Sequence, residues 1–273
     1  MTTDFAPGLH IAAGRAADVD AYDRWTGRWS RLFVPSVLAA AEVGPGQCVL
    51  DVSTGTGEAA LMALPMVGAS GAVVGVDIAP AMLESARSRL NSPGFLPVAA
   101  DGQALSFRDG SFDAVFCQLG LMFFPDPARG LAEFRRVLRR GRRAAVCVIS
   151  TPDRAPMWSI LAEALSGAIP KRRDMLHLSF ALADLKRLES LFANAGFGEV
   201  VVQRSQREDT IESFDAYWEP IEAGMGSMPQ VYLALQEAER RRIRDEVRAR
   251  LAPFESGGRL RMSVEMLIGV GRA

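Results

Sequence analysis

The chain has 273 residues, of which 49% are hydrophobic and 23% are charged, and its net charge at neutral pH is −1. Such a chain can bury a sizeable core, and the near balance of acids and bases gives no overall attraction to nucleic acid or to anionic lipid. No apolar run approaches the length of a membrane span, and no positively charged start precedes an apolar segment. The sequence therefore predicts a cytoplasmic protein whose partner is a small molecule.

The length fits a single α/β domain with insertions, residues 1–273, since such domains often reach about 250 residues. Three cysteines, Cys48, Cys117 and Cys147, each lie inside an apolar run. An odd number of thiols in apolar surroundings favours buried free cysteines over a disulfide or a metal site. No metal is expected.

Residues 19–43 show a helical pattern that ends at a Gly-Pro-Gly turn. Trp25 and Trp29 share one face of this helix, with arginines between them. The pattern by itself fits a helix that is docked by its tryptophans and has solvated arginines, because aromatic stripes often belong to a core.

An apolar run over residues 49–52 leads directly into Gly55-x-Gly57, which predicts a strand, a tight turn and a helix. Glycine at both positions permits positive φ, and a free helix N-terminus favours an anion or a nucleotide. The spacing also satisfies the dinucleotide-binding pattern. Asp51 argues against a dinucleotide, because the Asp51 carboxylate would repel a pyrophosphate. The same carboxylate could accept hydrogen bonds from an ammonium group.

A second buried strand, residues 71–76, ends at Asp77, where a carboxylate can accept both hydroxyls of a ribose. The helix that follows carries Met82, either in the core or against a base. A third strand is predicted over residues 95–99 and a fourth over 112–117. The loop after the fourth strand should face a ligand, because ligands of open α/β sheets bind beyond the carboxyl ends of the strands.

Residues 127–140 predict an amphipathic helix followed by a fifth strand over 144–149. Its arginines could form a nucleic-acid patch, but a solvated face with cations at a helix C-terminus is the simpler interpretation. Beyond the fifth strand the pattern predicts a helical segment over 150–170, and a sixth strand follows near 200–202. A long helix is expected over 229–252.

These motifs together resemble one family. The run from Val49 to Gly57 resembles the first motif of the class I S-adenosylmethionine (SAM) dependent methyltransferases, with Ser53 where that family usually has glycine. The segments 100–107 and 118–126 resemble its later motifs, and the Trp/Arg helix is similar to the start of UbiE-like (type 11) methyltransferases.

The resemblance implies a doubly wound, mostly parallel, seven-stranded Rossmann-like sheet with an antiparallel last strand and helical cap insertions. It also implies a division of the chain into a lid (1–45), a SAM-binding core (46–150), two caps (151–180 and 207–258) and a last strand (259–273).

The resemblance and the strand ends together give a set of candidate site residues. The cofactor would be bound by Asp51, Ser53, Gly55, Gly57, Asp77, Ile78, Met82, Asp101, Gly102 and Gln118. The substrate pocket would be lined by Trp25, Trp29, Leu121, Phe123 and Trp158. His177 is the candidate general base, although an isolated histidine is more often structural.

The predicted function is transfer of a methyl group from SAM to an O, N or C atom of a small apolar or aromatic molecule by direct displacement, with S-adenosyl-L-homocysteine as product. Alignment of the reactants and exclusion of water would be the main contribution of the protein. Two alternatives remain open: a SAM-binding protein of the same fold that transfers no methyl group, and an NAD-dependent oxidoreductase.

Overall fold

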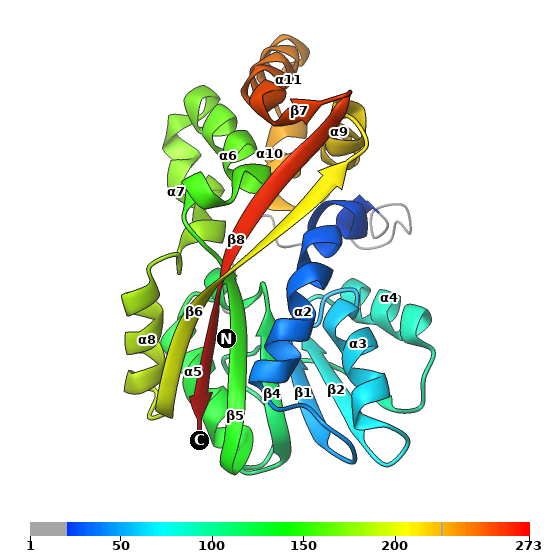
Figure 1. Cartoon of the computed structure of the whole chain (residues 1–273), viewed down its shortest axis with the longest axis vertical. Coiled ribbons are helices and arrows are strands. Elements are labelled where there is room, and N and C mark those ends of the chain that lie inside the picture. The colour runs from blue at the N-terminus through cyan, green and yellow to red at the C-terminus, as the bar shows by residue number, and fades with distance from the viewer. Residues whose placement is uncertain (1–20, 225) are drawn as a thin grey trace.

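The computed structural model describes residues 21–224 and 226–273. The first part of the predicted lid, residues 1–20, lies outside the described residues. Most of the chain forms one twisted sheet with helices on both faces, and a helical cap stands above the carboxyl ends of the first strands (Figure 1).

The sheet has the strand order β3-β2-β1-β4-β5-β8-β6, with the short β7 paired to β8. The first five strands are parallel, whereas β8 runs antiparallel to both of its neighbours, β5 and β6. The strands are β1 (Cys48–Val52), β2 (Ala72–Asp77), β3 (Phe95–Ala99), β4 (Phe112–Gln118), β5 (Leu138–Ile149), β6 (Gly198–Ile211), β7 (Glu255–Ser256) and β8 (Arg259–Arg272). The predicted mostly parallel, Rossmann-like sheet with an antiparallel last strand is confirmed. In the described part of the chain it has eight strands rather than the predicted seven, because the two-residue β7 pairs with β8.

Helices on both faces explain why the central strands are apolar throughout. Every residue of β4 is buried, as expected for a parallel strand covered on both sides. One face is covered by α2 (Arg28–Ala40), α3 (Glu58–Val67) and α4 (Pro80–Leu90), and the other by α5 (Pro127–Val137) and α8 (Leu185–Asn194) (Figure 1). A single π-helical turn, η1 (Asp23–Gly27), precedes α2.

The cap is built on the long strands β6 and β8, whose paired upper halves extend beyond the parallel strands and reach the helices above them (Figure 1). Its helices are α6 (Pro156–Ala168), α7 (Arg173–Leu176), α9 (Phe214–Glu222), α10 (Ser227–Leu233) and α11 (Glu237–Leu251). Short 3₁₀ turns lie at η2 (Leu121–Phe123), η3 (Pro152–Arg154), η4 (Pro170–Arg172), η5 (Leu178–Phe180) and η6 (Ala252–Phe254). None of the described helices is long and apolar enough to cross a membrane.

Three predicted boundaries were wrong. The helix predicted over residues 127–140 ends at Val137, because Leu138 begins β5 by pairing with Phe112 of β4. The strand predicted over 200–202 is the much longer β6, which runs to Ile211. The helix predicted over 229–252 is broken into α10 and α11.

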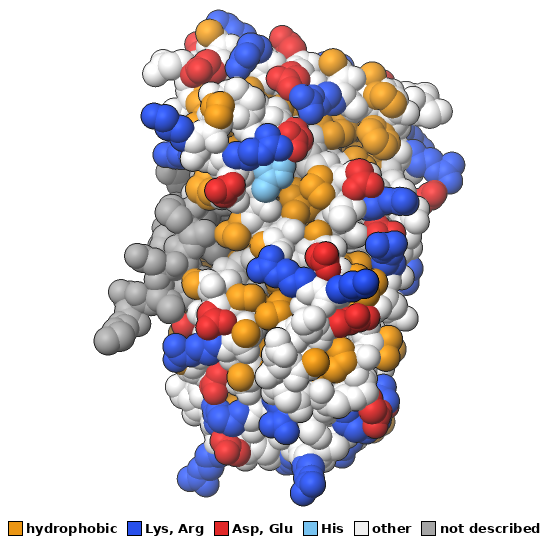
Figure 2. Space-filling model, turned by 90° about the vertical axis from the view of Figure 1, so that its left-hand side faces the viewer, with side chains coloured by type: hydrophobic (Ala, Val, Ile, Leu, Met, Phe, Trp, Pro, Cys, Tyr) orange, Lys and Arg blue, Asp and Glu red, His pale blue; other side chains and the backbone are white. Residues whose placement is uncertain are grey.

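Charged side chains of both signs are interspersed over the face shown in Figure 2, with apolar groups between them. No single-sign patch gathers on that face. The view agrees with the balanced composition of the chain.

Candidate functional site

Three polar side chains stand at the carboxyl ends of adjacent parallel strands. Asp51 is the penultimate residue of β1, Asp77 ends β2 and Gln118 ends β4. The register of the strands places their ends at one edge of the sheet. This edge is the usual ligand position in a doubly wound fold.

Three neighbouring hollows, which share Tyr22 and Leu119 in their walls, form a crevice above this edge. The inner chamber reaches Asp51, and the wide chamber reaches Asp77 and Met82. The aromatic chamber lies under the cap, against Trp25 and Trp158. The wide and aromatic chambers have empty volumes of about 730 and 550 Å³, which include space open to solvent. Hollows of this size accommodate small organic ligands.

The Asp77 carboxylate is held in place by the backbone on both sides. Its Oδ2 accepts from the Gly55 N–H at 2.9 Å and its Oδ1 accepts from the Ala79 N–H at 2.9 Å. Burial raises the pKa of this carboxyl, and the backbone N–H groups oppose that shift. Each oxygen keeps a further acceptor position, so the group can also receive the two hydroxyls of a ribose.

Asp51 is completely buried and only half satisfied. Its Oδ2 accepts from the Thr54 hydroxyl at 2.7 Å, whereas its Oδ1 has no hydrogen-bond partner. Burial, with a contribution from Asp77, raises the pKa of Asp51 to about 7. A buried acceptor without a partner is costly, so this atom is suited to a ligand that brings a donor.

Gln118, at the end of β4, likewise has one bonded and one unpartnered polar atom in its side chain. Its Nε2 donates to the Ser30 carbonyl at 3.2 Å, while its buried Oε1 has no partner. Gln118 and Asp51 both line the inner chamber. Two unpartnered acceptor oxygens in one chamber fit a ligand with several donors on a cationic group, such as an ammonium.

The glycines of the first turn have different roles. Gly55 has φ +56° and an open side, so a ligand can approach its backbone. Gly57, with φ +84°, begins α3, and a Cβ atom there would lie 2.6 Å from Leu90 Cδ1. The structure therefore gives Gly57 a packing role between α3 and α4 and does not place it on the crevice.

The π-helical turn η1 is held to the core by an ionic cluster. Arg89 on α4 donates to Asp23 of η1 at 3.0 Å and to Glu58 on α3 at 2.7 Å. The Thr56 hydroxyl donates to the other Asp23 oxygen at 2.7 Å. This cluster holds η1 above the first glycine turn, and a π-helical turn at such a position is typical of functional sites.

The predicted substrate residues divide into two groups. Trp25, Phe123 and Trp158 line the aromatic chamber. Trp29 and Leu121 are fully buried and line none of the three chambers, because both point into the core. The Trp29 ring packs edge-on to Trp158 at 6.4 Å between centroids, so it supports the chamber wall from behind.

The structure brings Asp51, Ser53, Gly55, Asp77, Ile78, Met82 and Gln118 together along the inner and wide chambers. Asp101 and Gly102 do not line them. The Asp101 carboxylate accepts from the backbone N–H of Gln103 at 2.8 Å, and the side of Gly102 where a Cβ would stand is filled by the Phe124 ring.

His177 also lies away from the crevice. It follows α7 in the cap, its side chain is 18% exposed, and its Nε2 is 3.5 Å from Glu163 Oε1. It lines none of the three chambers. The structure therefore gives no support to its predicted role as a base.

Sequence reasoning missed two residues that line all three chambers. These are Tyr22, just before η1, and Leu119, just after β4. Tyr22 lies three residues before Trp25 in the sequence, but only Trp25 and Trp29 were predicted as pocket residues of this segment. Leu119 has φ +55°, a strained backbone conformation that the sequence does not announce.

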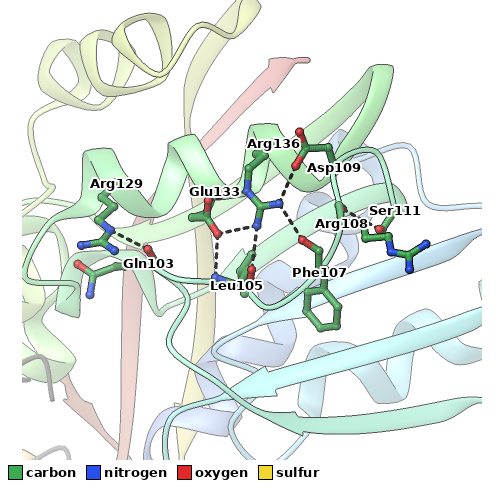
Figure 3. A network of polar contacts seen from close by, with 9 residues as sticks. All are labelled: Gln103, Leu105, Phe107, Arg108, Asp109, Ser111, Arg129, Glu133 and Arg136. Carbon is green, nitrogen blue, oxygen red and sulfur yellow. Dashed lines mark hydrogen bonds and ion pairs between the residues drawn. The ribbon is translucent and has the colours of Figure 1, made fainter. Parts of the chain in front are cut away.

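A polar network holds the loop that follows β3 against α5 (Figure 3). The Arg136 guanidinium donates to Glu133, to the carbonyls of Leu105 and Phe107, and to Asp109, at distances of 2.7–2.8 Å. Glu133 also accepts from the Leu105 N–H at 2.8 Å. The network fixes the loop between β3 and β4 at the sheet edge, and none of its residues lines the three chambers.

About half of the chain is similar in sequence to known proteins. Residues 50–146 match the family described as "Methyltransferase domain". A demethylmenaquinone methyltransferase of Renibacterium salmoninarum is 38% identical over 145 residues, 53% of this chain and 57% of that protein. The Geotalea uraniireducens ubiquinone/menaquinone biosynthesis C-methyltransferase UbiE is 36% identical over 129 residues, 46% of this chain and 53% of that protein. The chain thus spans little more than half the length of these relatives.

Solved structures share the fold at low identity. The YcgJ protein of Bacillus subtilis has a TM-score of 0.57 and 18% identity, covering 90% of this chain and 99% of that one. A Haemonchus contortus phosphoethanolamine N-methyltransferase bound to S-adenosylhomocysteine also has a TM-score of 0.57, with 16% identity, over 93% of this chain and 56% of that one. These comparisons identify the matched part of the chain, residues 50–146, as a methyltransferase domain similar to those of UbiE-type methyltransferases.

Proposed function

We propose that this protein binds SAM in the inner and wide chambers and transfers its methyl group to a small aromatic molecule held in the aromatic chamber. The observation that carries the proposal is the pair of buried, unpartnered oxygens, Asp51 Oδ1 and Gln118 Oε1, in the same chamber. Both are acceptors, as the ammonium group of SAM requires.

The other residues of the crevice fit the rest of the cofactor. Asp77 would receive the ribose hydroxyls, and the Met82 side chain, at the wall of the wide chamber, would contact the base. Ser53 and Gly55 line both chambers and would flank the sulfur end. When bound, SAM supplies an activated methyl group, so the protein needs no nucleophile of its own.

The contribution of the chain to the reaction would be alignment and exclusion of water. The lid helix, fastened by Arg89 and Asp23, closes one side of the crevice, and the cap closes the other. Holding two reactants in line can lower a barrier by several kcal/mol. Among the described residues, no acidic, basic or histidine side chain lines the aromatic chamber, so alignment is the larger contribution.

The rings of Trp25, Phe123 and Trp158 support an aromatic acceptor. The names of the relatives point the same way, since they act on demethylmenaquinone or in ubiquinone and menaquinone synthesis. A quinol-type aromatic compound is therefore the first acceptor to test. A small-molecule partner and a cytoplasmic location remain our predictions.

The test has two parts. Calorimetry with SAM, S-adenosylhomocysteine and NAD should show binding of the first two alone. Incubation of the protein with methyl-labelled SAM and a metabolite extract should then give a labelled small molecule. Binding without any labelled product would instead favour the alternative of a SAM-binding protein that transfers no methyl group, whereas tight binding of NAD alone would favour an oxidoreductase.

A further inference from the structure

The aromatic chamber meets the two cofactor chambers at one aromatic side chain with a polar group. Tyr22 lines the inner, wide and aromatic chambers, as does the apolar Leu119. A methyl donor in the first two chambers and an acceptor in the third can meet beside these two residues. Thr26 lines the inner and aromatic chambers, so Tyr22 is the polar side chain that borders all three.

The surroundings of Tyr22 keep its hydroxyl protonated. Burial raises the pKa of the Tyr22 phenol, and the negative charges of Asp77 and Asp23 add to the effect. The Thr26 hydroxyl is hydrogen-bonded to Tyr22 and also lines the aromatic chamber. A protonated phenol carries one O–H donor, so Tyr22 can donate a hydrogen bond to a ligand oxygen.

The remaining polar groups of the aromatic chamber are weaker candidates. Among the described residues its wall carries no charged side chain, and its other hydroxyls, on Ser179 and Ser227, lie on the cap side, away from the cofactor chambers. The rest of the wall is apolar or aromatic, with Trp25, Phe123 and Trp158 as its rings. Such a wall selects a flat apolar molecule, and one hydroxyl at the junction fixes its orientation.

We propose that Tyr22 orients the methyl acceptor by donating a hydrogen bond from its hydroxyl to an oxygen atom of a hydroxylated aromatic molecule bound in the aromatic chamber. This inference rests on the proposed function and narrows its substrate class to aromatic molecules that carry a hydroxyl or carbonyl oxygen close to the methylated atom. Tyr22 is a positioning residue in this account and does not remove a proton.

Two aromatic probes that differ in a single hydroxyl test the inference: 1-naphthol and naphthalene. Their binding to the full chain is measured by equilibrium dialysis in the presence of saturating S-adenosylhomocysteine. Tyr22→Phe should weaken 1-naphthol binding about fivefold, the usual worth of one neutral hydrogen bond, and leave naphthalene binding within about twofold.

A matched control is Tyr232→Phe, which removes a hydroxyl bonded to Glu222 that lines no chamber. It should change neither affinity. If Tyr22→Phe fails to fold, Thr26→Val, which removes the hydroxyl bonded to Tyr22, should weaken 1-naphthol selectively to a smaller extent. Circular dichroism of each variant establishes that it is folded.

The inference is overturned if Tyr22→Phe weakens both probes equally, which would indicate packing alone, or changes neither. It is also overturned if the wild-type protein binds S-adenosylhomocysteine but neither probe. In each of these cases cofactor binding, and with it the proposed function, still stands. Failure of S-adenosylhomocysteine to bind the wild-type protein would instead overturn the proposed function, and the inference with it.

Discussion

Ser53 and Gly120 meet at the floor of the crevice so closely that a Cβ atom at position 120 would lie 2.4 Å from the Ser53 Cβ and 2.5 Å from its Oγ. Ser53 has φ +59°, a left-handed conformation that usually favours glycine. The serine side chain, unusual at this point of the first motif, therefore depends on a glycine after β4.

Gly120→Ala should destabilise the protein by about 1–3 kcal/mol, because the added methyl group has no space. Ser53→Gly in the same chain should recover most of this loss, although Cys117 Sγ, 2.9 Å from the added atom, keeps the rescue incomplete. Urea unfolding of the two single variants and the double variant measures the coupling. Gly167→Ala in α6, where no atom lies within 4 Å, is the control and should be neutral or stabilising. Equal losses in Gly120→Ala and the double variant would contradict the account.

The binding of S-adenosylhomocysteine should depend on pH through Asp51. Its pKa of about 7 in the free protein lies above the ordinary value near 4, so the carboxyl holds a proton below neutrality. A bound ammonium favours the ionised form. Affinity should therefore fall as the pH is lowered from 7 to 5.5, by up to about tenfold per pH unit. Above about pH 8 the ligand amine loses its proton and affinity should fall again.

Asp51→Asn is the matched variant for this prediction, since it keeps the shape of the side chain and removes its titration. Its affinity should be lower at pH 7.5 and nearly constant between pH 5.5 and 7. Calorimetry in buffers of different ionisation enthalpy should also show proton release on binding near pH 6.5 in the wild-type protein alone. The same acid slope in both proteins would assign the titration to another group.

Arg136→Lys should lower the free energy of unfolding by about 2 kcal/mol, although the charge is retained. A lysine cannot donate hydrogen bonds to Glu133, Asp109 and two backbone carbonyls at the same time, because those contacts need the planar guanidinium (Figure 3). Arg108→Lys is the control, since the hydrogen bond drawn for Arg108 uses its backbone carbonyl. Urea unfolding at pH 7 distinguishes them, and an equal effect of both substitutions would argue against the network.

The same network makes a pH-dependent contribution to stability. Hydrogen bonding to Arg136 lowers the pKa of Glu133, so this stabilisation is complete above the ordinary glutamate value and is lost as the pH falls through the lowered one. The difference between wild type and Arg136→Lys should therefore shrink in acid.

His177→Gln should leave the rate of methyl transfer within about twofold of wild type. The imidazole Nε2 lies 3.5 Å from Glu163 Oε1 in the cap, and His177 lines none of the three chambers. A general base would contribute about 10²-fold or more. Steady-state rates with labelled SAM decide the matter, and a loss of that size would restore His177 as a base.

Much of the fold and part of the site could be predicted because they depend on local patterns. The apolar runs before Asp51 and Asp77 identified the first two strands, and their ends placed both carboxylates at one sheet edge. The end of the helix at Val137 could not be predicted, because it depends on the pairing of Leu138 with Phe112, 26 residues earlier in the chain.

The residues that line the aromatic chamber were also hard to predict, because contacts between distant parts of the chain place them there. Trp25 and Trp29 are alike in sequence, yet one lines the chamber and the other packs behind its wall. That difference arises from the packing of η1 and α2 against the cap. Tyr22 was missed because its role depends on three chambers meeting at one point, which no local pattern records.

The central claim is that one crevice holds the adenosine of SAM through Asp77 while Asp51 and Gln118 receive its ammonium group. The most direct test is the calorimetric affinity of Asp77→Ala for SAM, with Asp126→Ala, which removes the N-cap of α5 outside the crevice, as the matched control. We predict a loss of about 100-fold for Asp77→Ala, because two hydrogen bonds to a charged group disappear, and no more than twofold for the control. An unchanged affinity in a folded Asp77→Ala protein would contradict the account.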